Sequence, residues 1–267
     1  MSLTINTNLE AMDAQRNLNN TQMKLSQSME RLSSGLRINS AADDVAGYAI
    51  SQRLQSQVNG LNQAAQNSQD AISLAQTAQG SLNDVTQMLQ RVRELAVQYA
   101  NGTTSTTDQE AIKSEVNQLV SEMERVGETT KFNGVSLLSE EATISFQVGA
   151  NDAEVIAVKT LDLKTAIEGK IELGGEESIK GIEEAISKVT AAAGEMGAVQ
   201  DRIQYTEANL EVYAQNLSSA VSGISDVNMA VEMTAFTKAQ VLQQAGVAIL
   251  TQAKHLPQAA LKLIEGG

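Results

Sequence analysis

Residues 182–224 read IEEAISKVTAAAGEMGAVQDRIQYTEANLEVYAQNLSSAVSGI, and an apolar residue returns at every seventh position of this segment. The series is Ile182, Val189, Met196, Ile203, Leu210, Leu217 and Ile224. A companion series, apolar except for Thr206, follows three positions later. Two series with this spacing stay on one side of an α-helix over many turns. The segment therefore predicts one long helix that packs lengthwise against another helix.

A second ladder with the same period lies in the first half of the chain. Its members are Leu54, Leu61, Ser68, Ala75, Leu82, Leu89 and Ala96. After it, Asn101 and Gly102 form a dipeptide that tolerates a positive φ, so the next helix should fold back beside this one. Pro257 is the sole proline, so almost nothing interrupts the helices from within. We predict a mainly α fold, built as a long antiparallel helical rod or coiled coil.

The pattern also predicts where the elements begin and end. Helices are expected over residues 3–33, 44–100, 106–126, 178–224 and 227–256, with Gly35 as a helix end. Thr106 or Thr107 should cap the third helix, and Glu110 would complete a capping box with Thr107. Apolar and polar residues alternate over parts of 143–160, which predicts a small β-hairpin in the middle of the chain. Pro257 is expected to kink or end the last helix.

Composition narrows the range of functions. A net charge of −13 with a pI near 4.6 disfavours nucleic acid as a partner, because phosphates are neutralised by Lys and Arg. The sequence has no Cys and a single histidine, His255, so we expect no metal site, no cofactor and no catalytic residues. We therefore expect that the protein is not an enzyme. No long apolar run is present, so no membrane is expected as a partner. The polar segment 1–10 does not read as a cleaved secretory signal.

Both ends of the chain carry apolar stripes but few charges. Thin amphipathic helices of this kind are poorly stable alone, so we expect the ends to be disordered in the free chain and ordered by contact with other copies. On this basis residues 1–40 with 227–267 should form an inner domain of terminal helices, and residues 41–226 a rod domain. The candidate assembly residues are Ile5, Leu9, Leu18, Leu25, Leu32, Leu242, Ile249 and Leu256. A simple antiparallel coiled coil with frayed ends is the plainer alternative.

Several short segments resemble those of bacterial flagellins, in the same order along the chain. They are SSGLRINSAADD at 33–44, QRVRELAVQ at 90–98, FNG at 132–134, FTK at 236–238 and LQQA at 242–245. Together with shorter matches they extend over nearly the whole chain, except about residues 150–180. The sequence is therefore similar to a flagellin along most of its length.

This resemblance implies a structural subunit that self-assembles into the hollow flagellar filament for motility. In flagellins the two chain ends pair as a coiled coil that lines the inner tube, which adds Leu36, Arg37 and Phe236 to the expected assembly residues. Large variable outer domains normally lie between the two halves of a flagellin. The segment between the hairpin and residue 178 is short, so we expect no large outer variable domain here.

The resemblance also implies partners and a location. Flagellins pass unfolded through the flagellar export apparatus, with an export chaperone and without a cleaved signal peptide. They assemble outside the cell beneath a filament cap, beyond the hook–filament junction proteins. In many flagellins an animal Toll-like receptor binds the helix with the Arg-Val-Arg-Glu-Leu segment, and Arg91, Leu95 and Glu115 occupy the matching positions. A hook–filament junction protein of the same architecture and a secreted coiled-coil adaptor are the alternatives.

Overall fold

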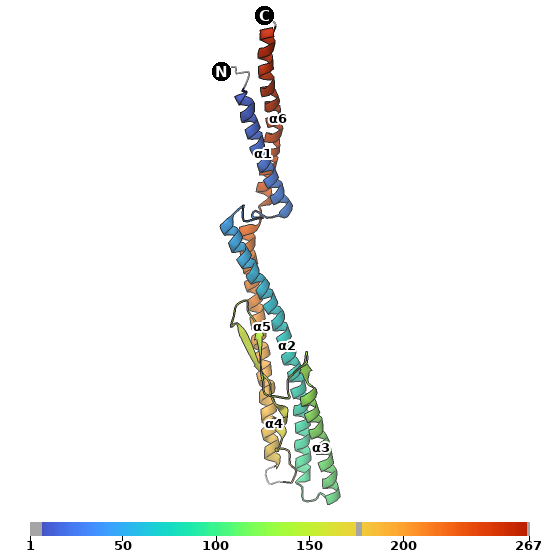
Figure 1. Cartoon of the computed structure of the whole chain (residues 1–267). Helices are drawn as coiled ribbons and strands as arrows, with labels where there is room; N and C mark the ends of the chain where they lie inside the picture. Colours follow the sequence, from blue (N-terminus) through green and yellow to red (C-terminus); the bar gives the residue numbers. More distant parts are fainter. Residues whose placement is uncertain (1–6, 175–177, 266–267) are drawn as a thin grey trace. The chain divides into compact units, whose positions relative to one another are not determined.

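The computed structural model describes residues 7–174 and 178–265, with side chains as far as His255 in the last helix. Most of these residues are helical, as the heptad pattern predicts (Figure 1). The helices are α1 (Leu9–Ser34), α2 (Val45–Tyr99), α3 (Thr106–Thr129), α4 (Leu163–Ile167), α5 (Ser178–Ser225) and α6 (Met229–Glu265). The strands are β1 (Lys131–Phe132), β2 (Val135–Ser136), β3 (Thr143–Gln147) and β4 (Val155–Lys159). The mainly α prediction with a small hairpin is confirmed.

The chain divides into two compact units. Unit 1 comprises residues 1–56 and 217–267, and unit 2 comprises residues 57–216. Helices α2 and α5 continue through both units, so each boundary falls inside a helix rather than in a loop. The sequence suggests a different division, into a domain of terminal helices and a rod domain, with borders in the connectors near residues 40 and 227. That division stays a functional prediction.

The core of unit 2 lies where α2 and α5 run antiparallel. Gln69 of α2 donates a hydrogen bond to Glu207 of α5 over 2.9 Å, and Arg93 of α2 pairs with Glu183 of α5 over 2.9 Å. Residue numbers thus increase along α2 while those of its neighbours in α5 decrease, which shows that the two helices are antiparallel. Every member of the first ladder from Leu61 to Ala96 is buried, as is every member of the second from Ile182 to Leu210. Ser68, the polar member, donates to the carbonyl of Ala64, which satisfies its buried hydroxyl.

Helix α3 folds back onto α2, as the short break at Asn101-Gly102 predicts. Its buried residues are Ile112, Val116, Met123 and Gly127. The predicted cap at Thr106 or Thr107 is wrong, because the N-cap is Ser105, whose hydroxyl oxygen accepts from the N–H of Asp108. Ser105 also donates to the Asp108 carboxylate, so the short Ser-x-x-Asp pair replaces the expected capping box.

Two small antiparallel sheets lie between α3 and α5. The predicted hairpin is β3 with β4, which pair from Thr143–Lys159 to Gln147–Val155, and it packs on α2 through a hydrogen bond from Asn67 to the Gln147 carbonyl. The two-residue strands β1 and β2 were not predicted, although their turn holds Asn133 and Gly134 at positive φ. Helix α4 was not predicted either.

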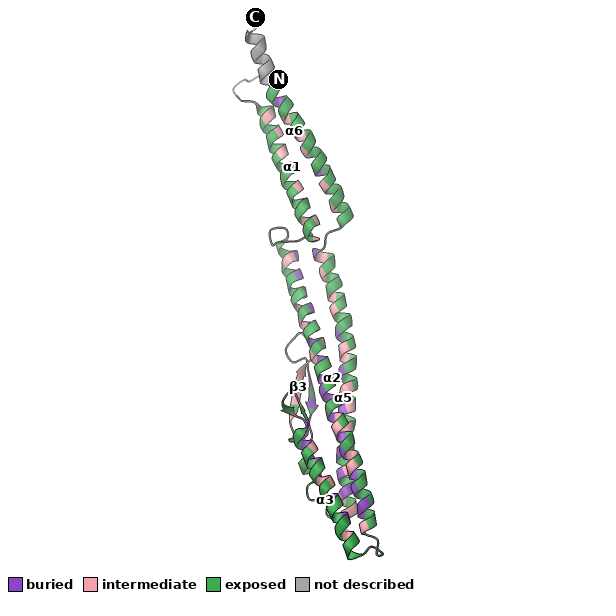
Figure 2. Ribbon diagram, turned by 90° about the vertical axis from the view of Figure 1, so that its right-hand side faces the viewer, coloured by how far each residue is buried: buried purple, intermediate pink, exposed green. Residues whose placement is uncertain are grey.

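In unit 1, α1 and α6 lie side by side and antiparallel, and most of their residues are exposed (Figure 2). Gly35 ends α1 in the left-handed conformation, as predicted, and its N–H donates to the Arg31 carbonyl. Of the two outcomes expected at Pro257, an end of the helix is excluded, since α6 runs on to Glu265. Within the described residues, no helix combines the length and apolarity that a membrane span requires.

Candidate assembly and recognition surfaces

The seam between α1 and α6 combines small residues with larger apolar ones. The residues of α1 that are buried or half-buried are Ala11, Ala14, Leu18, Thr21, Leu25, Ser28, Arg31 and Leu32. Those of α6 are Glu232, Phe236, Ala239, Gln243, Gly246, Leu250 and Ala253. A Cβ atom added at Gly246 would lie 3.3 Å from Leu18, so the leucine packs directly over the glycine backbone. Apart from Arg31, both sets repeat every seven residues, which keeps the two helices in contact along their length.

A polar cluster lies in this seam where α1 ends and α6 begins. Ser28 donates to the carboxylate of Glu232, and a guanidinium nitrogen of Arg31 lies 3.8 Å from the same carboxylate. Because the helices are antiparallel, the last turn of α1 and the first turn of α6 are neighbours. Each helix dipole favours the charge found there, a cation at a C-terminus and an anion at an N-terminus. Sequence reasoning missed this cluster, since none of its three residues interrupts an apolar run.

The connectors that leave α1 and α5 are hydrogen-bonded to each other. Leu36 and Asp226 form an isolated antiparallel bridge, and the N–H of Val227 donates to the Gly35 carbonyl over 3.0 Å. The N–H of Arg37 donates to the carbonyl of Ser225, and its guanidinium donates to the carbonyl of Ile224. Arg37 thus satisfies carbonyls at the C-terminus of α5, where a cation is also favoured.

The rest of the N-terminal connector folds around Asp43. Its carboxylate accepts from the N–H groups of Asn39 and Ser40 and from the side chain of Gln27. The hydrogen bond from the Ser40 N–H is the largest of the effects that hold the pKa of Asp43 below its ordinary value, against the opposing effect of desolvation. Asp44 accepts from the Gly47 N–H in the first turn of α2. Both carboxylates therefore lie at a helix N-terminus, as the sequence predicts.

The predicted assembly residues fall into three groups. Leu18, Leu25, Leu32, Leu36 and Phe236 are half-buried, and Arg37 joins the connectors. Leu9, Leu242 and Ile249 are 65%, 50% and 60% exposed. Ile5 lies outside the described residues, as does the side chain of Leu256. The seven-residue series of Leu242 and Ile249 is thus not the one that faces α1.

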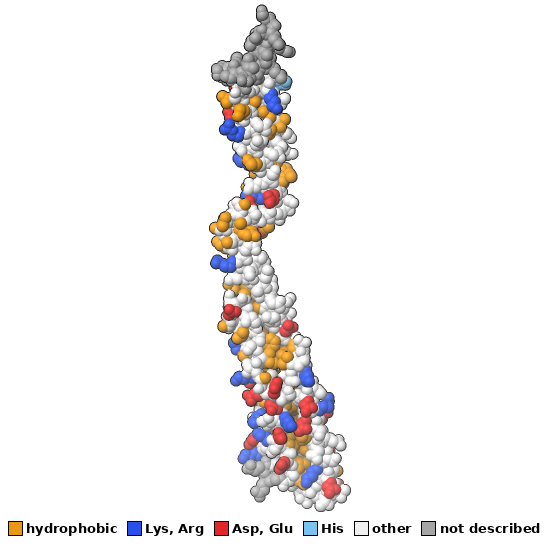
Figure 3. All heavy atoms as spheres, in the orientation of Figure 1, with side chains coloured by type: hydrophobic (Ala, Val, Ile, Leu, Met, Phe, Trp, Pro, Cys, Tyr) orange, Lys and Arg blue, Asp and Glu red, His pale blue; other side chains and the backbone are white. Residues whose placement is uncertain are grey.

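Exposed apolar residues therefore flank the seam on both helices. On α1 they include Leu9, Met12 and Met23, and on α6 they include Val231, Val241, Leu242, Val247 and Ile249. Figure 3 shows hydrophobic side chains over α1 and α6, whereas most of the charged side chains in this view lie on unit 2. Exposed apolar residues gathered along one helix pair are a candidate site for contact with another protein surface.

A second surface lies on unit 2, around Arg91. Its guanidinium donates to the Glu115 carboxylate of α3 over 2.9 and 3.1 Å and to Glu94 over 3.2 Å. The hydrogen bonds to Glu115, and next to Glu94, raise the pKa of Arg91. Leu95 is only 2% exposed and belongs to the core beneath this pair, so its side chain is not presented at the surface. Of the three residues suggested for receptor recognition, Arg91 and Glu115 are together and accessible.

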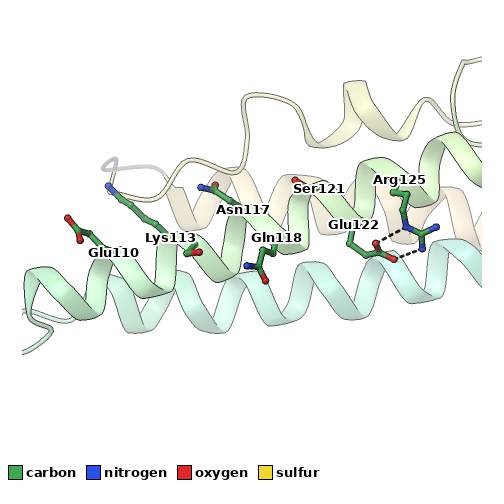
Figure 4. Close-up of a pocket in the computed structure, with 8 residues that line it drawn as sticks. Glu110, Lys113, Asn117, Gln118, Ser121, Glu122 and Arg125 are labelled. Atoms are coloured by element: carbon green, nitrogen blue, oxygen red, sulfur yellow. Dashed lines mark hydrogen bonds and ion pairs between the residues drawn. The ribbon is translucent and has the colours of Figure 1, made fainter.

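A shallow hollow runs along the outer face of α3 (Figure 4). Its lining residues all come from this one helix, and they include Glu110, Lys113, Asn117, Gln118 and Arg125. The figure shows the ion pair of Arg125 with Glu122, which lowers the pKa of the glutamate. No nucleophile with an adjacent base lines the hollow. Among the residues described, no group of three or more His, Asp and Glu could hold a metal ion.

The chain has long helices with a heptad pattern, its two ends pair through α1 and α6, and apolar residues of this pair stay uncovered. These features define a class of helical proteins that associate with copies of themselves. Two family models match the chain: the bacterial flagellin N-terminal helical region over residues 5–143, and the flagellin C-terminal helical region over residues 179–264. The chain is 44% identical to a flagellin of Halalkalibacterium halodurans, over 98% of this chain and all of that one. It is 39% identical, with the same coverage, to a flagellar filament 33 kDa core protein of Treponema phagedenis.

Solved structures agree with these sequence matches. The crystal structure of Bacillus cereus flagellin aligns with a TM-score of 0.50 at 30% identity, over 58% of this chain and 94% of that one. A putative flagellar hook-associated protein from Vibrio parahaemolyticus aligns with a TM-score of 0.59 at 13% identity, over 69% of this chain and all of that one, which shows a shared fold.

The chain belongs to the bacterial flagellin family. It is a structural subunit of the flagellar filament, which flagellins form outside the cell by assembling with copies of themselves. It is a short form, because the described residues between α3 and α5 contain only the two small sheets and α4.

Proposed function

We propose that the apolar residues exposed on α1 and α6 pack against neighbouring copies in the innermost layer of the filament. The observation that carries this proposal is the exposure of Leu242 and Ile249, which α1 leaves uncovered in the single chain. Burying such surface is the main favourable term in protein association. Unit 2, with its fully buried ladders, then forms the next layer outward. Contacts of this kind that do not close into a ring produce a helical polymer.

We further propose that the terminal helices become ordered on assembly. The pair buries few side chains completely: within α1 the one buried residue is Ser28, and within the described side chains of α6 they are Ala239 and Ala253. Such small residues contribute little apolar area, and elements with few buried contacts open readily. In the free chain, amide exchange should be fast in α1 and α6 and slow in the part of α2 that belongs to unit 2. Equal protection in all three would contradict this proposal.

The variant Leu242→Asp tests the assembly role. In the filament the charge would enter an apolar contact, at a cost of several kcal/mol. Since about 1.4 kcal/mol corresponds to a factor of ten, the critical concentration for polymerisation should rise by about 100-fold or more. The matched control is Val135→Asp, because Val135 is exposed to a similar extent, 48%, but lies on β2. Sedimentation and negative-stain images should show filaments for the control alone. Normal filament yield from Leu242→Asp would refute the proposed packing.

We propose partners for export and assembly by analogy with the family. These are the flagellar export apparatus, an export chaperone, the filament cap and the hook–filament junction proteins, with export that removes no signal peptide. Membership of the flagellin family supports this route. Mass spectrometry of filaments sheared from cells checks it, because the subunit should keep its N-terminal residues.

A second role, recognition by an animal Toll-like receptor, is favoured by the Arg91–Glu115 pair. An acidic side chain of the receptor could replace Glu115 as the acceptor of hydrogen bonds from Arg91. A hydrogen-bond donor of the receptor could then bind the Glu115 carboxylate. The test compares Arg91→Ala with Arg93→Ala, because Arg93 is similarly exposed on the same helix and pairs with Glu183. Receptor reporter cells should respond at least tenfold less to the first variant than to the second. Equal responses would remove Arg91 from this role.

A hook–filament junction protein is the nearest alternative, and the hook-associated neighbour shares this fold. Counting copies per flagellum distinguishes the two, because a filament subunit is present in great excess. A secreted coiled-coil adaptor would remain a small oligomer at high concentration. The filament role requires no chemistry, and we propose that the chain is not an enzyme.

A further inference from the structure

Helix α6 contains a backbone carbonyl that lacks its usual hydrogen-bond partner. In an α-helix each carbonyl accepts from the N–H four residues later, and the acceptor four residues before Pro257 is Ala253. Proline has no N–H, yet α6 continues through Pro257 to Glu265. Ala253 is only 5% exposed, because it lies in the seam against α1. Its carbonyl therefore lacks the usual partner within α6 and is open to a donor from another element.

Asn8 supplies that donor. Its side-chain Nδ2 donates to the Ala253 carbonyl over 2.8 Å, and the bond is partly shielded from water. The Oδ1 of the same amide accepts from the Ala11 N–H over 3.0 Å and caps the N-terminus of α1. One side chain thus completes the first turn of one terminal helix and the interrupted turn of the other.

We propose that Asn8 is a positioning residue that recognises the proline-interrupted turn of α6 and fixes the distal end of the α1–α6 pair. The polar cluster of Ser28 and Glu232 holds the opposite end. Between them the seam repeats every seven residues, so its small and apolar residues alone define the alignment of the two helices poorly. A donor matched to one particular carbonyl removes that ambiguity, because only one alignment places Asn8 beside Ala253.

The inference rests on the proposed packing of the terminal helices in the filament, and polymerisation of the full chain provides its readout. The variant Asn8→Ser keeps a good N-cap residue but is too short to reach Ala253. In the parental sequence it should raise the critical concentration about tenfold, because a partly buried carbonyl loses its side-chain donor.

The decisive comparison repeats Asn8→Ser in a Pro257→Ala background. An alanine there restores the backbone N–H that bonds the Ala253 carbonyl, so loss of the Asn8 donor should then change the critical concentration less than about twofold. The variant Asn8→Asp, which also keeps the cap but not the donor, should match Asn8→Ser: a clear effect in the parental sequence and a small one in the Pro257→Ala background. Circular dichroism of the monomers should be unchanged, since unit 2 is untouched.

An equal effect of Asn8→Ser in both backgrounds would overturn the inference, because the residue would then act only as a cap. No effect in the parental sequence would overturn it as well. These outcomes differ from failure of the assembly role itself. In that case Leu242→Asp would polymerise normally, whatever residue stands at position 8.

Discussion

The docking of α3 on α2 makes a quantitative prediction for the variant Met123→Ala. Met123 is 0% exposed and belongs to the core cluster that also includes Val116 and Val85. Truncating a fully buried methionine removes its apolar contacts and leaves a cavity, at a cost of about 3 kcal/mol. For a domain the size of unit 2, residues 57–216, each kcal/mol lowers Tm by about 2–4 °C. The predicted decrease in Tm is therefore about 6–12 °C.

Thermal unfolding followed by circular dichroism at 222 nm measures this shift. The protein should be kept below its polymerisation threshold, because assembly would stabilise the folded state by mass action. The matched control is Met23→Ala on α1, where the methionine is 63% exposed, and its Tm should change by less than about 2 °C. Equal shifts for the two variants would refute the assignment of α3 to the core. A loosened α3 should also weaken receptor signalling, because α3 carries Glu115.

Three further predictions concern single residues. Ser105→Ala removes the N-cap of α3 and should lower the free energy of unfolding by about 1 kcal/mol, measured by thermal unfolding. Ser105→Asp should keep most of the stabilisation that the cap provides. The hydrogen bond from Thr165 lowers the pKa of Asp162 in the folded protein below its ordinary value of 3.8. The ionised carboxylate therefore stabilises the folded state above pH 3.8, and this stabilisation is lost as the pH falls through the pKa of the folded state. In acid titrations of stability, Asp162→Asn should accordingly make unit 2 less sensitive to pH in that window, and an unchanged titration would contradict this. Gly35→Ala forces a side chain onto φ +73° and should lower the melting temperature of filaments, whereas Gly80→Ala, in open space on α2, should not.

Much of unit 2 could be predicted because its sequence signals are local and repeated. The seven-residue series that include Leu82 and Ile203 predict which faces of α2 and α5 are buried, and the structure confirms both faces. Gly35 marks a helix end because its left-handed conformation is a local preference of glycine. Asn101-Gly102 marks a break as well, although neither residue has a positive φ. The hairpin β3–β4 was found from its alternating pattern. Strands β1 and β2 have only two residues each, too few to show any period.

The N-cap of α3 shows a limit of local reasoning. Ser105, Thr106 and Thr107 are all good capping residues, so the sequence offers three starting points for one helix. In the structure Ser105 is the cap, and its hydroxyl exchanges hydrogen bonds with the N–H and the carboxylate of Asp108. Local capping preferences alone do not distinguish the three candidates.

The terminal seam could not be predicted for a different reason. Helix α6 carries two seven-residue series, one with Leu242 and Ile249 and one with Ala239 and Gly246, and hydrophobicity favours the first. The second faces α1, because Leu18 fits over a glycine and brings the helices close. This arrangement covers Ala239 and Gly246, with Phe236 and Leu250 half-buried beside them, and it leaves Leu242 and Ile249 exposed. Under the packing proposed above, this exposed apolar surface is left for contacts with other copies. The series that hydrophobicity favours would then be the one that couples the order of the terminal helices to assembly.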